Sequence, residues 1–263
     1  HLFCQECKGL ALNFSGTGTQ KVEQLINQTF PESKICRLDM DTSKSSFNIA
    51  SILKSFSNQE FDILIGTQMV AKGLDFPNAT LVGIINADLG LYIPDFRATE
   101  RVFQLIYQAS GRSGRSSKEG EVVIQTYSPN SPVIENAKNL DINKFYEKEL
   151  LERAELNYPP YSWLAKVEFI GPNKFKVYSL IEEVKHNLKD RYIGLDILGP
   201  APCFLEKLKN KYRYQLVFKS KKSYDPNGSL LHAFIRKNFK IYENKKPLGQ
   251  NRINIYFDPI SLL

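Results

Sequence analysis

Two stretches of the sequence decide the fold: Asp62-Ile63-Leu64-Ile65-Gly66-Thr67-Gln68 and Gln108-Ala109-Ser110-Gly111-Arg112-Ser113-Gly114-Arg115. The first is a short run of apolar, β-branched side chains that ends at Gly-Thr, which predicts a buried parallel strand. Open α/β sheets bind their ligands at the carboxyl ends of such strands. We therefore expect the residues after Ile65 to lie at a ligand-binding edge.

The second stretch closes a predicted helix that begins near Ala98. Its apolar residues recur at helical spacing and form one buried stripe. The stripe consists of Ala98, Val102, Leu105, Ile106 and Ala109. This face is expected to anchor the helix.

A different face of the same helix carries Gln108, Arg112 and Arg115 at positions i, i+4 and i+7. Three groups able to bond a phosphate therefore point the same way. Gly111 and Gly114 lack the Cβ atoms that would keep a ligand at a distance. A solvated basic helix end, where arginine interacts favourably with the helix dipole, would explain the octet equally well.

Taken together, the two stretches resemble motifs V and VI of superfamily-two helicases, and more narrowly the PriA family (primosomal protein N′) of bacterial replication-restart helicases. The resemblance rests on the amino-acid sequences of residues 66–77, 94–101 and 108–115. Residues 37–42, 156–160, 198–202, 212–215 and 258–263 extend it over nearly all of the chain. It implies an ATP-dependent DNA helicase of 3′-to-5′ polarity that recognises stalled replication forks and initiates primosome assembly for replication restart.

The resemblance also implies roles for individual residues. Gln108, Arg112 and Arg115 would contact the phosphates of ATP bound with Mg²⁺, and arginine would stabilise charge on the transferring group. The other nucleotide-site residues, which would couple DNA to nucleotide, are Gly66, Thr67, Gln68 and Gly111. The sequence contains no Gly-x-x-x-x-Gly-Lys-Ser/Thr stretch. We therefore expect a carboxyl-terminal fragment that lacks the Walker lobe and is inactive alone.

The cysteines are expected to play two different parts. Cys4 and Cys7 are spaced so that both thiolates can bind one tetrahedral metal, but zinc needs four ligands. By resemblance they are the last pair of a zinc-binding insert, so the Zn²⁺ site is expected to be incomplete. Cys36 and Cys203 are expected to be inert buried hydrophobes, since four cysteines make no disulfide framework in a chain of this kind.

Charge is unevenly distributed along the 263 residues. Residues 1–140 hold 13 of the 35 Lys and Arg against 14 Asp and Glu, so the net charge of +7 belongs to the second half. The excess peaks around one acid, Glu206, at Lys207, Lys209, Lys211, Arg213, Lys219, Lys221 and Lys222. Such a cluster favours a polyanionic partner, although a merely solvated basic surface is the alternative.

The resemblance specifies the partners further. They are forked and single-stranded DNA, the acidic tail of single-stranded-DNA-binding protein, and other primosome proteins. The candidate contacts for DNA or the acidic tail are Lys207, Lys209, Lys211, Arg213, Lys221 and Lys222. No apolar run is long enough to span a bilayer, and a cytoplasmic protein without a membrane partner is expected.

Strands and helices alternate through the first half, which predicts a doubly wound, mostly parallel α/β sheet. By resemblance, residues 1–15 end the zinc-binding insert and residues 16–140 form a RecA-like second helicase lobe. A connecting helix and linker occupy residues 141–160. Residues 161–263 follow the order β-α-β-β-α-β, which predicts an α+β split βαβ domain.

A competing hypothesis is a non-catalytic nucleic-acid-binding module with a degenerate motor lobe. The intact Gln-x-x-Gly-Arg-x-Gly-Arg pattern of residues 108–115 counts against it, because a decayed motor has no reason to keep both arginines.

Overall fold

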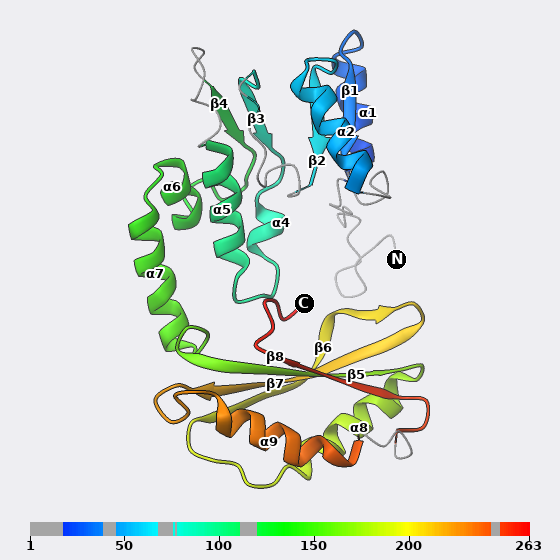
Figure 1. Cartoon of the computed structure of the whole chain (residues 1–263), viewed down its shortest axis with the longest axis vertical. Coiled ribbons are helices and arrows are strands. Elements are labelled where there is room, and N and C mark those ends of the chain that lie inside the picture. Colours follow the sequence, from blue (N-terminus) through cyan, green and yellow to red (C-terminus); the bar gives the residue numbers. More distant parts are fainter. Residues whose placement is uncertain (1–17, 39–45, 68–75, 77, 111–119, 243–247) are drawn as a thin grey trace, which may run out of the picture. The chain divides into compact units, whose positions relative to one another are not determined.

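The structure, a computed structural model, describes residues 18–38, 46–67, 76, 78–110, 120–242 and 248–263 (Figure 1). The chain divides into two compact units. The first comprises residues 1–84 and 105–123, and the second comprises residues 85–104 and 124–263. The predictions on Cys4, Cys7, Gln68 and residues 111–115 lie outside the described residues.

In the first unit, the described helices and strands follow the predicted order. The elements are α1 (Thr19–Thr29), β1 (Ile35–Leu38), α2 (Ser46–Ser57), β2 (Ile63–Gly66) and β3 (Leu81–Ile84). Strand β1 pairs in parallel with β2, with Leu38 opposite Gly66. Leu38 and Ile65 are buried, and Asp62 Oδ2 accepts a hydrogen bond from Lys34 N at 2.8 Å where the two strands begin. The predicted parallel strand is therefore confirmed, although Ile65 alone of the four β2 residues is fully buried.

Strand β3 pairs with β4 (Glu121–Ile124). In the part of the chain that the structure describes, the β1-β2 pair and the β3-β4 pair are separate two-stranded sheets. Each of these strands is only four residues long. The mixed α/β class holds, and the single doubly wound sheet stays a prediction.

In the described residues between β3 and the carboxyl-terminal sheet, the helices are α4 (Asp88–Leu91), α5 (Ala98–Ser110), α6 (Pro132–Lys138) and α7 (Ile142–Glu155). The predicted stripe of α5 is confirmed, because Ala98, Val102, Ile106 and Ala109 are buried. Leu105 is only half-buried, whereas Phe103, which the stripe omits, is 1% exposed. Phe103 is buried because its ring stacks on Phe145 of α7, with ring centroids 4.0 Å apart.

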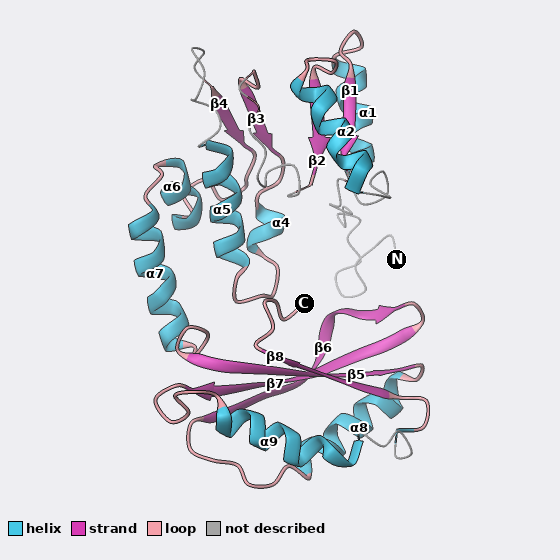
Figure 2. Ribbon diagram, in the orientation of Figure 1, coloured by secondary structure: helices cyan, strands magenta, loops and turns pink. Residues whose placement is uncertain are grey.

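The carboxyl-terminal domain follows the predicted order of elements. These are β5 (Ser162–Gly171), α8 (Lys174–His186), β6 (Leu195–Leu208), β7 (Lys211–Lys221), α9 (Ser229–Phe239) and β8 (Arg252–Phe257), with a short 3₁₀ helix (Lys240–Tyr242) after α9. The sheet order is β6-β7-β5-β8, and all neighbouring strands are antiparallel. The core of this domain lies between one face of the sheet and helices α8 and α9 (Figure 2).

Strand β6 is longer than the predicted strand at residues 195–198. It continues to Leu208 through Gly199, Pro200 and Pro202 because two register shifts against β7 absorb these residues. Proline is tolerated there since β6 is an edge strand and bulges leave backbone groups unpaired. Among the helices that the structure describes, none combines the length and the apolar content that crossing a bilayer requires.

Candidate functional site

The carboxyl end of β2 presents the first predicted site residues. Ile65 is 7% exposed, whereas Gly66 and Thr67 are exposed where the strand ends. This is the location at which a parallel strand can offer backbone and hydroxyl groups to a ligand. Gln68, the third member of the predicted group, lies outside the described residues.

Helix α5 presents Gln108 on a face that differs from its buried stripe. Gln108 is exposed, while Ile106 and Ala109 on either side of it are 0% and 3% exposed. A helix anchored in this way leaves the amide of Gln108 free to bond a ligand. Gly111, Arg112 and Arg115 lie outside the described residues, so their contact with phosphate stays a prediction.

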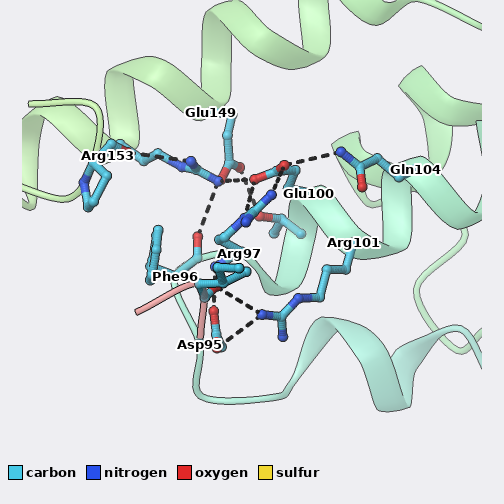
Figure 3. A network of polar contacts seen from close by, with 11 residues as sticks. Asp95, Phe96, Arg97, Glu100, Arg101, Gln104, Glu149 and Arg153 are labelled. Atoms are coloured by element: carbon cyan, nitrogen blue, oxygen red, sulfur yellow. Dashed lines mark hydrogen bonds and ion pairs between the residues drawn. The ribbon is translucent and has the colours of Figure 1, made fainter. Parts of the chain in front are cut away.

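A polar network surrounds the start of α5 (Figure 3). The side chain of Asp95 is fully enclosed, and its Oδ1 accepts a hydrogen bond from Arg97 N at 2.9 Å. Its Oδ2 accepts bonds from Ser261 Oγ and from Leu262 N, the latter at 3.0 Å. Arg101 lies between them, because its Nη2 donates to Asp95 Oδ2 at 3.4 Å and to the carbonyl of Ile260 at 3.3 Å. One carboxylate therefore holds both the start of α5 and the carboxyl-terminal segment.

Glu100 is the second carboxylate of the network. Arg97 donates to both of its oxygens, from Nε at 3.0 Å and from Nη2 at 2.7 Å, and Arg153 Nη2 donates to Oε2 at 2.8 Å. Burial raises the pKa of Glu100, but the hydrogen bonds from Arg97 and Arg153 outweigh it, so the pKa falls to about 2. Glu100 is therefore ionised at neutral pH although it is only 8% exposed.

Arg153 brings helix α7 into the network. Besides Glu100, it pairs with Glu149 Oε1 at 2.8 Å, and Glu149 Oε2 accepts from Thr99 Oγ1 at 2.8 Å. Its guanidinium also reaches the carbonyls of Phe96 and Pro159, at 3.5 Å and 3.4 Å. Removing one partner of such a buried pair leaves an uncompensated charge, which typically costs about 3–5 kcal/mol.

A stack of cations and aromatic rings runs beside the ion pairs. The guanidinium of Arg153 lies 5.4 Å from the ring centroid of Phe96, which stacks on Tyr158 at 5.2 Å and 4°. Lys219 Nζ also lies over the ring of Tyr158, 4.5 Å from its centroid. Lys219 donates to the carbonyl of Leu156 at 2.7 Å, and burial lowers its pKa. The stack connects residues 94–97 to strand β7.

Sequence reasoning missed this network. Residues 94–101 served there only as part of the resemblance to the family, and Glu149, Arg153 and Ser261 were given no role. Glu100 and Arg153 are 53 residues apart, so no local periodicity could have paired them. The available signal was the i,i+4 spacing of Glu149 and Arg153, which is typical of ordinary surface pairs.

The basic cluster does not form one surface. Lys207, Lys209 and Lys211 are exposed at the β6-β7 turn, whereas Arg213 Nε donates to the buried Glu168 Oε1 at 2.6 Å. Lys219 is enclosed as described above. Since β7 runs from Lys211 to Lys221, Lys221 and Lys222 lie roughly 30 Å from the turn. Lys222 Nζ lies 4.1 Å from the ring centroid of Trp163.

The metal-binding residue types give no complete site within the described ranges. No group of three or more His, Cys, Asp or Glu side chains there could hold a metal ion. Cys36 and Cys203 are buried free thiols, and burial raises the pKa of each to about 11. They are therefore the inert hydrophobes that the sequence predicts.

Comparison with known proteins identifies the family. The helicase conserved C-terminal domain matches residues 1–117, and the primosomal protein N C-terminal domain matches residues 154–260. The replication restart protein PriA of Bacillus subtilis (strain 168) is 41% identical over 257 residues, which are 97% of this chain. The chain belongs to the PriA family. PriA of Borreliella burgdorferi is 38% identical over 99% of this chain, and PriA of Chlamydia pneumoniae is 40% identical over 88%.

The PriA relatives are much longer than this chain, which spans 31% of the Bacillus and Chlamydia proteins and 38% of the Borreliella protein. The polar network connects the two matched regions of the PriA family. Asp95, Phe96 and Glu100 lie in the helicase match, whereas Tyr158 and Lys219 lie in the primosomal match. The resemblance seen in the sequence is thus confirmed at the level of the family.

Proposed function

We propose that this chain is the second motor lobe and the carboxyl-terminal domain of an ATP-dependent 3′-to-5′ DNA helicase. The complete protein would recognise stalled replication forks and initiate primosome assembly for replication restart. The observation that carries the proposal is the exposed Gln108 on α5. It stands away from a buried stripe and lies three positions before Gly111, the first residue of Gly-Arg-x-Gly-Arg, within a region that matches a helicase domain.

This chain would form one side of the nucleotide-binding site. Gly66 and Thr67 at the end of β2, together with Gln108, have the exposure that such a role needs. Arg112 and Arg115 would contact the phosphates of ATP bound with Mg²⁺, which supply the transferable group and its counter-charge. The Walker lysine would come from the rest of the protein, so the isolated chain would not hydrolyse ATP.

The domain assignment belongs to the same proposal. Residues 16–140 would be a RecA-like lobe in which the parallel β1-β2 pair is part of one doubly wound sheet, and residues 141–160 would connect it to the next domain. The β6-β7-β5-β8 order of antiparallel strands supports a split βαβ assignment for residues 161–263. Residues 1–15 would end a zinc-binding insert in which Cys4 and Cys7 supply half of a tetrahedral Zn²⁺ site.

The nucleic-acid surface would be the turn between β6 and β7. Lys207, Lys209 and Lys211 are exposed there, and Phe204 is 54% exposed on β6. Lysines beside an exposed aromatic ring suit single-stranded nucleic acid, because the ring can stack on a base. The acidic tail of single-stranded-DNA-binding protein is a second polyanion for the same turn. Arg213 and Lys219 are less suited, since each is already engaged inside the domain.

The test uses the full-length protein. We expect forked DNA to stimulate ATP turnover, and we expect Gln108→Ala to lower the stimulated rate while DNA affinity stays the same. A full-length protein that binds forked DNA but never hydrolyses ATP would contradict the proposal. That result would favour the non-catalytic nucleic-acid-binding module instead.

A further inference from the structure

Helix α5 belongs to both units of the chain. Its residues up to Gln104 lie in the unit that contains the carboxyl-terminal domain, and its residues from Leu105 lie in the unit that contains β2. Gln108 follows Glu100 by eight residues, which is about 12 Å along a helix axis. One helix, Ala98–Ser110, carries both residues.

Three separate contacts attach the start of α5 to the carboxyl-terminal half. The carboxylate of Asp95 accepts from Ser261 and Leu262, the ring of Phe96 stacks on Tyr158, and Glu100 pairs with Arg153. The carboxyl-terminal segment that Asp95 contacts is itself hydrogen-bonded to the sheet. Lys166 Nζ of β5, only 3% exposed as a residue, donates to the carbonyls of Leu262 and Leu263 at 2.9 Å each.

These contacts are directional, unlike the apolar packing nearby. Phe103 and Phe145 already bury an aromatic face between α5 and α7, so the ion pairs are not needed to form a core there. Buried ion pairs are weak evidence for stability, because desolvation offsets much of their attraction. The planar guanidinium of Arg153 instead fixes an orientation, since it bonds Glu100, Glu149 and two backbone carbonyls at once.

We propose that Glu100 and Arg153 are positioning residues that link DNA binding by the carboxyl-terminal domain to ATP turnover through helix α5. The inference rests on the proposed function, in which residues 108–115 contact nucleotide. A displacement of α7 and of the following domain would move Arg153. The ion pair between Arg153 and Glu100 would transmit this displacement to α5. The segment of residues 94–101 is thus a mechanical joint between the two family-matched regions.

The experiment compares two Arg/Lys→Met variants of the full-length protein. Arg153→Met keeps the apolar stem and removes the guanidinium. Lys148→Met removes an equal charge from the same helix, where the side chain of Lys148 is 53% exposed and lies 3.8 Å from the exposed Glu152. ATP turnover is measured with and without forked DNA, beside DNA affinity and Tm.

We expect Arg153→Met to lower the DNA-stimulated kcat at least tenfold, with basal turnover and DNA affinity within about twofold of wild type. Lys148→Met should behave as wild type. A merely structural role would lower basal and stimulated rates together, and that result would overturn the inference. Equal DNA stimulation in Arg153→Met and wild type would also overturn it.

A second variant covers the case in which Arg153→Met does not fold. Ser261→Ala removes one hydroxyl from the Asp95 contact and leaves every ion pair in place. We expect a smaller, severalfold loss of DNA stimulation, and unchanged stimulation would count against the joint. A wild-type protein without ATP turnover would refute the proposed function itself. A wild-type protein that responds to DNA, beside variants that respond equally, would refute only the positioning role.

Discussion

Arg153 Nη2 lies 2.8 Å from Glu100 Oε2, so helix α7 is ion-paired with the first turn of α5. Both side chains are largely enclosed, with exposed fractions of 13% and 11%. Glu100 is ionised across the neutral range, and an enclosed pair of this kind is screened little by salt. It joins the region that matches a helicase domain to helix α7, whose last two residues lie in the primosomal match.

The Glu100 pair predicts a pH-dependent stability. The pKa of Glu100 falls from 4.5 to about 2 on folding, so its contribution is present above about pH 4.5 and is lost as the pH falls toward 2. Glu100→Gln should lower the free energy of unfolding at pH 7 by on the order of 3 kcal/mol. Denaturant titrations at pH 7, 4 and 3 should show the gap to wild type shrinking with acid. A gap that is equal at all three values would contradict this, and the exposed Glu152→Gln serves as the control.

The β6-β7 turn predicts a local and salt-sensitive nucleic-acid contact. Replacing Lys207, Lys209 and Lys211 by Glu should weaken binding of single-stranded DNA and reduce its salt slope by about 2, since each phosphate contact contributes about 0.7. Lys237→Glu on α9, where Lys237 is 68% exposed, is the matched control. The measurement is a titration by fluorescence anisotropy at several salt concentrations. If the affinity for single-stranded DNA and its salt slope are unchanged, the turn is only a solvated surface.

The stacked rings between α5 and α7 predict a large loss of stability on truncation. Phe103 is 1% exposed and Phe145 is 3% exposed. Phe103→Ala should therefore lower the free energy of unfolding by about 3–5 kcal/mol, since it leaves a cavity that the helices fill only partly. Tyr127→Ala, at a residue that is 93% exposed, should change it little. A loss below about 1 kcal/mol for Phe103→Ala would show that the helices close over the space.

Zinc content tests the prediction for Cys4 and Cys7. Two thiolates leave half of a tetrahedral site to water, so the isolated chain should retain much less than one zinc ion. Metal analysis after dialysis gives the ratio directly. One tightly held zinc per monomer would mean that other ligands of this chain complete the site, and one zinc shared by two chains would indicate bridging.

Local patterns were sufficient for much of the fold. The stripe of α5 and the order of elements in residues 161–263 follow from periodicity, which each segment carries by itself. Contacts between distant segments could not be predicted in this way. Glu100 and Arg153 form a pair only when α5 and α7 lie together. The seven basic residues of the cluster are close in sequence, but the extended strand β7 separates them along its length and directs alternate side chains to opposite faces of the sheet.

The central claim is tested most directly by ATP turnover of the full-length protein carrying Arg112→Ala or Arg115→Ala, measured beside DNA binding. If both arginines contact the phosphates, each change should lower turnover by on the order of 10³-fold, as comparable arginine fingers do. DNA affinity without nucleotide should hardly change, because the basic turn of the carboxyl-terminal domain is untouched, and lysine should not restore either site. Normal turnover in both variants would contradict the account.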